Sequence, residues 1–361
     1  MFKKQVDLII LISLILLVVF GLIELSSASS DLGKVVFNDA YYYLKHQIFY
    51  GLSFGVLGFL IGVLVPYKRY KKITPLLLII NLVFLLALFT PLGVSSGGAE
   101  RWLKLGPIIF QPTELLKITL VLYLAAWFSN GRMNRRNFLE GFLPFIAIVG
   151  FIGLLLLFQH STSAAVILTL AALAIYFVGG ANPKYLAAIF ASGFLVLALA
   201  VWLTPYRFAR IATFLHPSEN AQGSSYQINQ SLISIGSGGF WGVGYGQSEI
   251  KRYLPARIDD SIFAVLAEEF GFVGSTFLIA AYLLLIIRGY LLARDTKDSF
   301  ARLILVGFST ILGVQVFIHI GANTGLIPLT GVPLPFISYG GTSLAIFITM
   351  AGMMLGISKY A

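Results

Sequence analysis

Long apolar runs separated by short polar segments repeat along nearly the whole chain. Each run is close to the roughly 20 residues that a helix needs to cross the hydrocarbon core of a bilayer. We therefore predict an all-α, polytopic integral membrane protein with about ten transmembrane helices. The runs fall at residues 8–26, 48–66, 74–91, 112–129, 139–158, 163–180, 185–204, 262–287, 300–320 and 343–358.

Composition agrees with this interpretation. Hydrophobic residues make up 58% of the chain and charged residues 11%, whereas soluble domains carry about 25% charged residues. The 361 residues leave no room for a soluble domain beside the spans, so we predict a single membrane domain, residues 1–361, and an uncleaved first helix. The absence of cysteine excludes disulfides, thiol catalysis and cysteine metal sites.

Basic residues fall on alternate loops, which sets the predicted orientation. Because basic loops stay in the cytoplasm, both termini are expected inside the cell, and the net charge of +10 is explained without nucleic acid. The basic positions on this side are Lys3, Lys4, Lys68, Arg69, Lys71, Lys72, Arg132, Arg135, Arg136, Lys184, Arg294 and Lys297. The outer side then receives segments 27–47, 92–111, 205–261 and 321–342.

Segment 205–261 is far longer than a plain connection, and its end carries the strongest candidate chemistry. Asp259 and Asp260 stand where this basic segment meets an apolar helix. Aspartate suits a helix N-terminus, so we expect Asp259 to cap the helix and Asp260 to face a cleft walled by Lys251 and Arg257. Such a cleft would suit a phosphorylated lipid.

Two further pairs of charged residues lie at membrane depth. Glu114 and Lys117 are three residues apart, so they share one helix face and can pair while facing a cavity. Glu268 and Glu269 follow Asp260 within the next apolar run. For both pairs a structural role and a functional role remain open.

Other outer motifs are less specific. Segment 92–111, with Arg101 and Trp102, is expected to be an amphipathic element at the membrane interface. The glycine-rich stretch 237–246 would leave backbone N–H groups free for anions. Segment 205–261 also carries Arg207 and Arg210. The four histidines, which show no metal-ligand spacing, are His46, His160, His216 and His319.

Four motifs give the whole chain a resemblance to the SEDS family (shape, elongation, division and sporulation), the polytopic peptidoglycan glycosyltransferases typified by FtsW and RodA. GQSEIKRYLP (246–255) looks closer to FtsW, whereas LTGVPLP (329–335) is also like RodA. The motifs are AERWLKLGPIIFQPTELLK (99–117), YQINQSLISIGSGGFWGVGYGQSEIKRYLP (226–255), DSIFAVLAEEFGFVG (260–274) and PLPFISYGGTS (333–343).

The resemblance implies a lipid II polymerase of the bacterial cytoplasmic membrane, working in cell division or elongation. It places the family's essential aspartate at Asp260, as general base. It also implies phosphate-facing or cavity-shaping roles for Arg101, Glu114 and Lys117. With the basic residues near Asp260 and a hydroxyl of the last outer segment, the predicted substrate-binding residues are Arg101, Glu114, Lys117, Lys251, Arg257 and Ser338. Two departures stand out: Ile258-Asp259 replaces the usual His-Thr, and the family's Pro-Asp-x-Gly-Thr pattern is missing at 159–163.

The resemblance further implies partners: lipid II, a class B penicillin-binding protein that supplies the transpeptidase, and other divisome or elongasome membrane proteins. No cofactor is indicated with certainty, and magnesium or manganese stays open. The alternative function is a lipid II flippase or transporter, in which the intramembrane charges line a path. A third is a scaffold without activity. Polymerisation requires Asp260, and a flippase does not.

Overall fold

A computed structural model describes residues 6–96, 99–106, 108–131, 135–215 and 225–360. Lys3, Lys4, Arg132 and His216, which the sequence analysis mentions, lie outside them. The helices, in chain order, are α1 Leu8–Phe37, α2 Tyr42–His46, η1 Gln47–Leu52, α3 Ser53–Leu64, α4 Tyr67–Ala87, α5 Pro112–Phe128, η2 Phe138–Phe142, α6 Leu143–Phe158, α7 Thr162–Val178, α8 Lys184–Trp202, α9 Pro205–Leu215, α10 Tyr226–Ser237, η3 Ile250–Arg252, α11 Ile262–Asp295, α12 Ser299–Asn323 and α13 Gly341–Ser358.

Every apolar run found in the sequence lies on one of these helices, so the all-α polytopic fold is confirmed. Seven helical segments among the described residues are long and apolar enough to cross a membrane. The count of ten crossings stays a prediction. Helix α7, with 17 residues, is apolar but shorter than those seven segments.

Segment 92–111 forms a small sheet, the one exception to the helical fold within the described ranges. Strands β1 (Gly93–Ser96), β2 (Ala99–Leu105) and β3 (Ile108–Phe110) pair antiparallel in the order β1-β2-β3. The sheet ends at Phe110, and α5 begins two residues later at Pro112. Proline suits the first turn of a helix. The sheet carries Arg101 to the head of α5.

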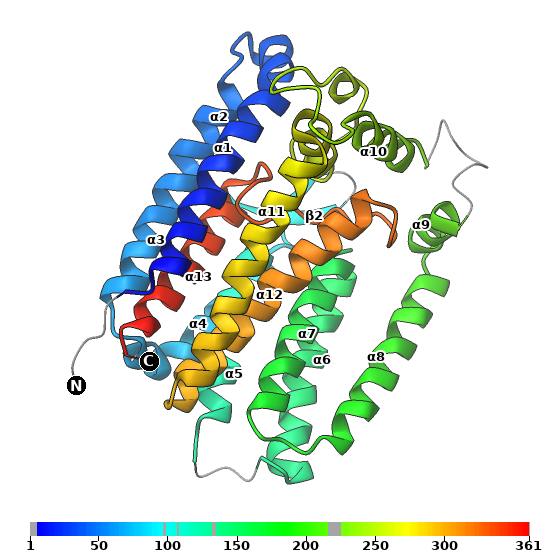
Figure 1. Ribbon diagram of the computed structural model, residues 1–361. Helices are drawn as coiled ribbons and strands as arrows, with labels where there is room; N and C mark the ends of the chain where they lie inside the picture. The colour runs from blue at the N-terminus through cyan, green and yellow to red at the C-terminus, as the bar shows by residue number, and fades with distance from the viewer. Residues whose placement is uncertain (1–5, 97–98, 107, 132–134, 216–224, 361) are drawn as a thin grey trace.

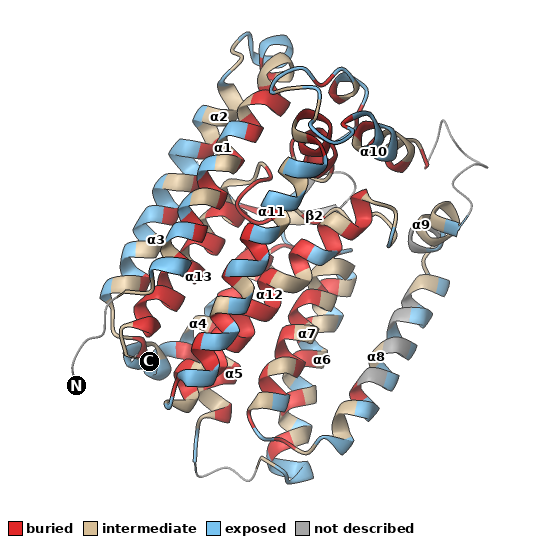
Figure 2. Ribbon diagram, in the orientation of Figure 1, coloured by how far each residue is buried: buried red, intermediate tan, exposed pale blue. Residues whose placement is uncertain are grey.

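The helices form one bundle, and both chain ends lie at the same end of it (Figure 1). Helices α12 and α13 are the most buried of the long helices (Figure 2), and α12 packs against α5, α7 and α11. The described parts of the outer segments, residues 88–96, 99–106, 108–111, 203–215, 225–261 and 324–340, lie toward the end opposite the start of α1 and the end of α13. Motifs far apart in the sequence therefore meet at one end of the bundle.

Glycine allows the close crossing of α3 and α13. A Cβ at Gly352 would come within 2.6 Å of the Phe59 backbone, and one at Gly356 within 2.3 Å of the Gly62 carbonyl oxygen. Small residues four apart let two membrane helices approach closely enough for backbone contact. The GMMLG stretch of α13 (352–356) is such a pattern.

Helix α11 breaks at Gly271, and the glycine-rich loop repairs the break. Gly271 has a φ of 64°, which interrupts the hydrogen bonds within the helix. Loop 239–244 satisfies the groups this leaves open. The bonds are Val243 N–H to the Glu268 carbonyl (2.9 Å), Gly244 N–H to the Glu269 carbonyl (3.0 Å), Phe272 N–H to the Gly239 carbonyl (2.9 Å) and Val273 N–H to the Phe240 carbonyl (3.2 Å).

These bonds correct one expectation. The N–H groups of Val243 and Gly244 are not free for an anion, because they donate to α11. Glycine is required here for approach: a Cβ at Gly242 would lie 2.2 Å from the Glu269 carbonyl oxygen, and its φ is 83°. The loop is part of the scaffold of α11.

We expect Gly242→Ala to lower the free energy of unfolding by about 2 kcal/mol, since it adds a backbone clash at a left-handed residue. Thermal unfolding in detergent, followed by intrinsic fluorescence, would show a lower apparent Tm. The matched control is Gly236→Ala on the exposed face of α10, where a Cβ meets nothing within 4 Å. Equal stability of the two variants would contradict the packing described here.

Candidate active site

Asp259 and Asp260 lie in a tight turn that ends just before α11. The Asp259 and Ser261 N–H groups both donate to the Ala256 carbonyl. The residue preceding the helix is Ser261, and no side chain caps it. The expectation that Asp259 caps the helix is therefore wrong: Asp259 lies two residues before Ser261, which holds the cap position.

The backbone of this turn is fixed by the last outer segment and by α12. Ser338 donates its hydroxyl to the Asp259 carbonyl (2.7 Å), and Asn323 at the end of α12 donates its amide to the Asp260 carbonyl (2.8 Å). The Tyr339 N–H donates to the Ile258 carbonyl at 2.7 Å. Three successive carbonyls are held from outside, so the two carboxylates have a defined direction.

The Asp260 carboxylate lies beside Gly331, and Gly331 lines a polar cavity. A Cβ built on Gly331 would sit 3.4 Å from Asp260 Oδ2. The cavity is formed where β2, α5, α7, α12 and the 330–333 segment meet. Its lining is Arg101, Gln111, Glu114, Lys117, His160, Ser161, Thr162, Ser163, Ala164, Ile167, Gln315, Thr330, Gly331, Val332 and Pro333.

Three of the predicted site residues therefore share this cavity: Arg101, Glu114 and Lys117. Glu114 and Lys117 pair as their spacing predicted, with Lys117 Nζ at 2.7 and 2.8 Å from the two carboxylate oxygens. Gln315 of α12 also accepts from Lys117 (2.7 Å). Both charges are almost fully buried, and the pairing offsets the cost of placing them at membrane depth.

A strap of irregular backbone, residues 329–335, lines the cavity with residues 330–333 and places Gly331 beside Asp260. Its carbonyls receive hydrogen bonds from side chains on four different helices. The donors are Arg210 to Leu329 (2.8 Å), Ser163 to Thr330 (3.1 Å), His319 Nδ1 to Val332 (2.7 Å), Gln315 to Pro333 (2.8 Å) and Tyr282 to Pro335. Such backbone persists at this depth because the protein supplies its partners.

Burial and nearby charges act in opposite directions on Asp260. Burial raises its pKa, and the Arg210 and Arg101 guanidiniums lower it. Burial first, and then the Asp260 charge, raise the pKa of Asp259 to about 7. The two acids therefore have different surroundings, and the arginines act on Asp260.

Lys251 and Arg257 do not wall a cleft around Asp260, which corrects the sequence expectation. The Lys251 ammonium contacts Glu269 (3.1 Å) and the Ser27 hydroxyl (3.2 Å). Arg257 pairs with Asp31 at 2.8 Å and donates to the Lys251 carbonyl at 2.7 Å. Both cations tie the 246–257 segment to α1 and α11.

Glu268 and Glu269 have contacts of a structural kind, because each accepts hydrogen bonds from neighbouring segments. Glu268 accepts from the Ser234 and Ser248 hydroxyls, each at 2.6 Å. Glu269 accepts from the Ser27 hydroxyl and from the Gly246 N–H at 2.9 Å. Each carboxylate fixes a neighbouring segment on α11.

Several residues of the site were not identified from the sequence. Gln315 was visible as an amide within an apolar run, but nothing in its spacing indicated Lys117 as its partner. Arg210 was noted only as a basic residue of the outer segment. Gly331 gave no signal, because its importance depends on Asp260 approaching from another part of the chain.

A metal site of protein ligands is not formed around Asp260. Across the described residues, no group of three or more His, Asp or Glu side chains is placed to hold a metal ion. The side chains near Asp260 offer two adjacent carboxylates and several cations, which is a poor ligand set for magnesium or manganese.

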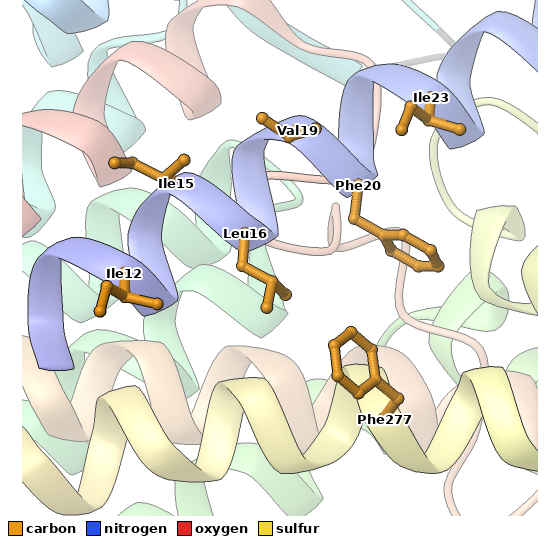
Figure 3. Close-up of a pocket in the computed structure, with 7 residues that line it drawn as sticks. All are labelled: Ile12, Ile15, Leu16, Val19, Phe20, Ile23 and Phe277. Atoms are coloured by element: carbon orange, nitrogen blue, oxygen red, sulfur yellow. The ribbon is translucent and has the colours of Figure 1, made fainter.

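A separate apolar groove lies between α1 and α11. Figure 3 shows the α1 side chains of Leu16 and Phe20 facing Phe277 of α11. Its lining is Ile12, Ile15, Leu16, Val19, Phe20, Ile23 and Phe277. It contains no polar side chain that could take part in chemistry.

Comparison with known proteins gives matches along the whole chain. The model of a family of cell cycle proteins, comprising FtsW, RodA and SpoVE, matches residues 7–361. A probable peptidoglycan glycosyltransferase FtsW of Geobacter sulfurreducens is 36% identical over 98% of this chain and 95% of its own length. Stage V sporulation protein E of Bacillus subtilis is 35% identical, covering 99% of this chain and 98% of its own.

Two solved structures share the fold. A chain from a peptidoglycan synthase complex that coordinates polymerization and crosslinking has a TM-score of 0.82 and 28% identity, with 99% of this chain and 98% of that chain covered. The rod shape determining protein RodA of Thermus thermophilus has a TM-score of 0.70 and 27% identity, with 98% and 96% covered.

The Asp259 pKa leads to a stability prediction. Its value of about 7 in the folded protein lies above the roughly 3.9 of an unfolded chain, so folding favours the protonated form. This contribution is fully present below about pH 4 and is lost as pH rises through 7. We expect Asp259→Asn to remove that part of the decline in apparent Tm between pH 5 and 8. Asp295→Asn, at an exposed position, should keep the wild-type decline, and an unchanged slope in Asp259→Asn would refute the assignment.

Proposed function

The chain belongs to the FtsW, RodA and SpoVE family of cell cycle proteins, and we propose that it is a peptidoglycan glycosyltransferase that polymerises lipid II. The acceptor sugar hydroxyl attacks the anomeric carbon of a second, lipid-linked sugar. Relatives named as peptidoglycan glycosyltransferases, similar over nearly their whole length, support this assignment. GQSEIKRYLP looks closest to FtsW, which favours a role in division.

One observation carries the proposal: the partly exposed Asp260 carboxylate lies beside Gly331, and Gly331 lines a cavity that also presents Arg101 and Lys117. A general base needs an acceptor that is poorly solvated but ionised at working pH. Burial strengthens Asp260 as a base, and the arginines keep its charged form accessible. The substrate carries a diphosphate, which suits a cavity lined by cations.

The step balances with this set of groups. Asp260 takes the proton of the attacking hydroxyl as the new bond between that oxygen and the anomeric carbon forms. The bond from the anomeric carbon to the diphosphate oxygen breaks, and undecaprenyl diphosphate leaves with the electron pair. Arg101 is placed to stabilise the negative charge that develops on this leaving group.

The other predicted site residues take positioning roles in this proposal. Ser338 holds the Asp259 carbonyl and also accepts from the Leu334 N–H at 2.8 Å. Lys251 and Arg257 are engaged by Glu269 and Asp31. We therefore assign these three residues to fixing the turn that carries Asp260, and Arg101, Glu114 and Lys117 to the cavity itself.

The protein is membrane-integral, and we propose the cytoplasmic membrane of a bacterium with both termini inside the cell. Helix α1 begins and helix α13 ends at one end of the bundle. The basic clusters around residues 68–72, 135–136 and 294–297 lie at this same end. Basic loops stay in the cytoplasm. The opposite end, with Asp260 and the cavity, then faces outward, where glycan strands are assembled.

We expect Asp260→Asn to reduce lipid II polymerisation by about 10² to 10⁴, since general-base removal costs that much. Asp259→Asn should keep most of the activity, because Asp259 has no assigned role in the reaction. Purified variants would be compared by gel analysis of polymer, with equal membrane insertion as a requirement. Near-normal polymer from Asp260→Asn would favour the flippase, which does not need this carboxylate.

We expect polymerisation to increase when a class B penicillin-binding protein is present. The basis is the likeness to a chain of a peptidoglycan synthase complex. Polymer would be measured for the isolated chain and for the complex at equal concentration. The complex with Asp260→Asn should remain inactive, which assigns polymer to this chain. Equal activity with and without the partner would count against the coupling.

A further inference from the structure

Helix α9 joins the site through a side-chain hydrogen bond to the strap. Figure 1 places α8 and α9 at the edge of the bundle. Arg210, near the middle of α9, donates from Nη1 to the Leu329 carbonyl at 2.8 Å. Leu329 begins the strap whose Gly331 lies beside the Asp260 carboxylate. The same guanidinium also acts electrostatically on Asp260.

We propose that Arg210 is a positioning residue that reaches from α9 to the strap, keeps Gly331 beside Asp260 and holds a guanidinium charge on this side of the turn. The inference rests on the proposed function, in which Asp260 is the general base. It assigns to α9, which no motif of the sequence linked to the cavity, a defined part in preparing that base.

The charges facing Asp260 make the contribution of Arg210 distinct. Asp259 stands next to Asp260 in the same turn, and Arg101 faces it from β2. Across the cavity, Glu114 and Lys117 form a pair with no net charge. Arg210 and Arg101 both lower the Asp260 pKa, and the place of Arg210 depends on where α9 sits.

The guanidinium group suits both tasks at once. Arginine has several N–H donors in a fixed plane, so one can donate to the Leu329 carbonyl while the charge remains near Asp260. The aliphatic stem of Arg210 also packs, because the residue is only partly exposed. Lysine would keep the charge and lose the planar set of donors, which separates the two effects.

The test is the pH dependence of polymerisation by the full chain in complex with its penicillin-binding protein partner, with lipid II as substrate. The turnover number of an enzyme with a general base falls at low pH, where the base is protonated. We expect Arg210→Gln to lower kcat at neutral pH and to move this acid limb upward by about one pH unit, as expected for loss of a nearby opposite charge. Arg210→Lys should leave the limb close to wild type.

Two controls separate the interpretations. Arg252→Gln removes an outer-face cation whose side chain is 73% exposed, and it should leave the limb in place. Arg210→Met, which keeps the stem, replaces Arg210→Gln if the latter does not fold as judged by apparent Tm. The proposal is overturned if the acid limb of the pH profile does not move in Arg210→Gln and Arg210→Met, or if it moves by the same amount in Arg252→Gln.

Failure of this inference is distinguishable from failure of the proposed function. If Asp260→Asn is inactive and Arg210→Gln behaves as wild type, only the role of Arg210 falls. If Asp260→Asn is active, the base assignment falls, and the inference falls with it.

Discussion

Irregular backbone close to membrane depth must have its hydrogen bonds satisfied by the protein, and the site depends on how this is done. Two stretches face this requirement: the break of α11 at Gly271 and the strap 329–335. An unsatisfied N–H or carbonyl would cost several kcal/mol in hydrocarbon. The glycine-rich loop pairs with the first stretch, and side chains of four helices pair with the second.

The same hydrogen bonds prepare the chemistry. A side chain that must accept a proton in the transition state works best when its direction is set beforehand. Ser338 and Asn323 fix the carbonyls of the Asp259–Asp260 turn, and the strap places Gly331 against the carboxylate. Glycine is suited to that position, because a side chain there would crowd Asp260 from the cavity side.

The charged residues of the outer end fall into two groups, those that hold the scaffold together and those that lie near Asp260. Lys251, Arg257, Glu268 and Glu269 are all engaged within the protein, and they attach the outer segments to α1 and α11. The arginines near Asp260 donate to backbone carbonyls, Arg101 to His160 at 2.5 Å and Arg210 to Leu329 at 2.8 Å. The charges of both arginines lower the Asp260 pKa.

The sequence by itself determined the membrane class, the apolar runs, the Glu114–Lys117 pair and the position of Asp260. These follow from local pattern: run length, three-residue spacing on a helix, and motif order. Only the tertiary structure decided which cation serves which acid, that Asp259 does not cap α11, and that Gly331 and Arg210 belong to the site. Contacts such as Arg210 to Leu329 join residues 119 apart, and no periodicity encodes a distance between separate helices.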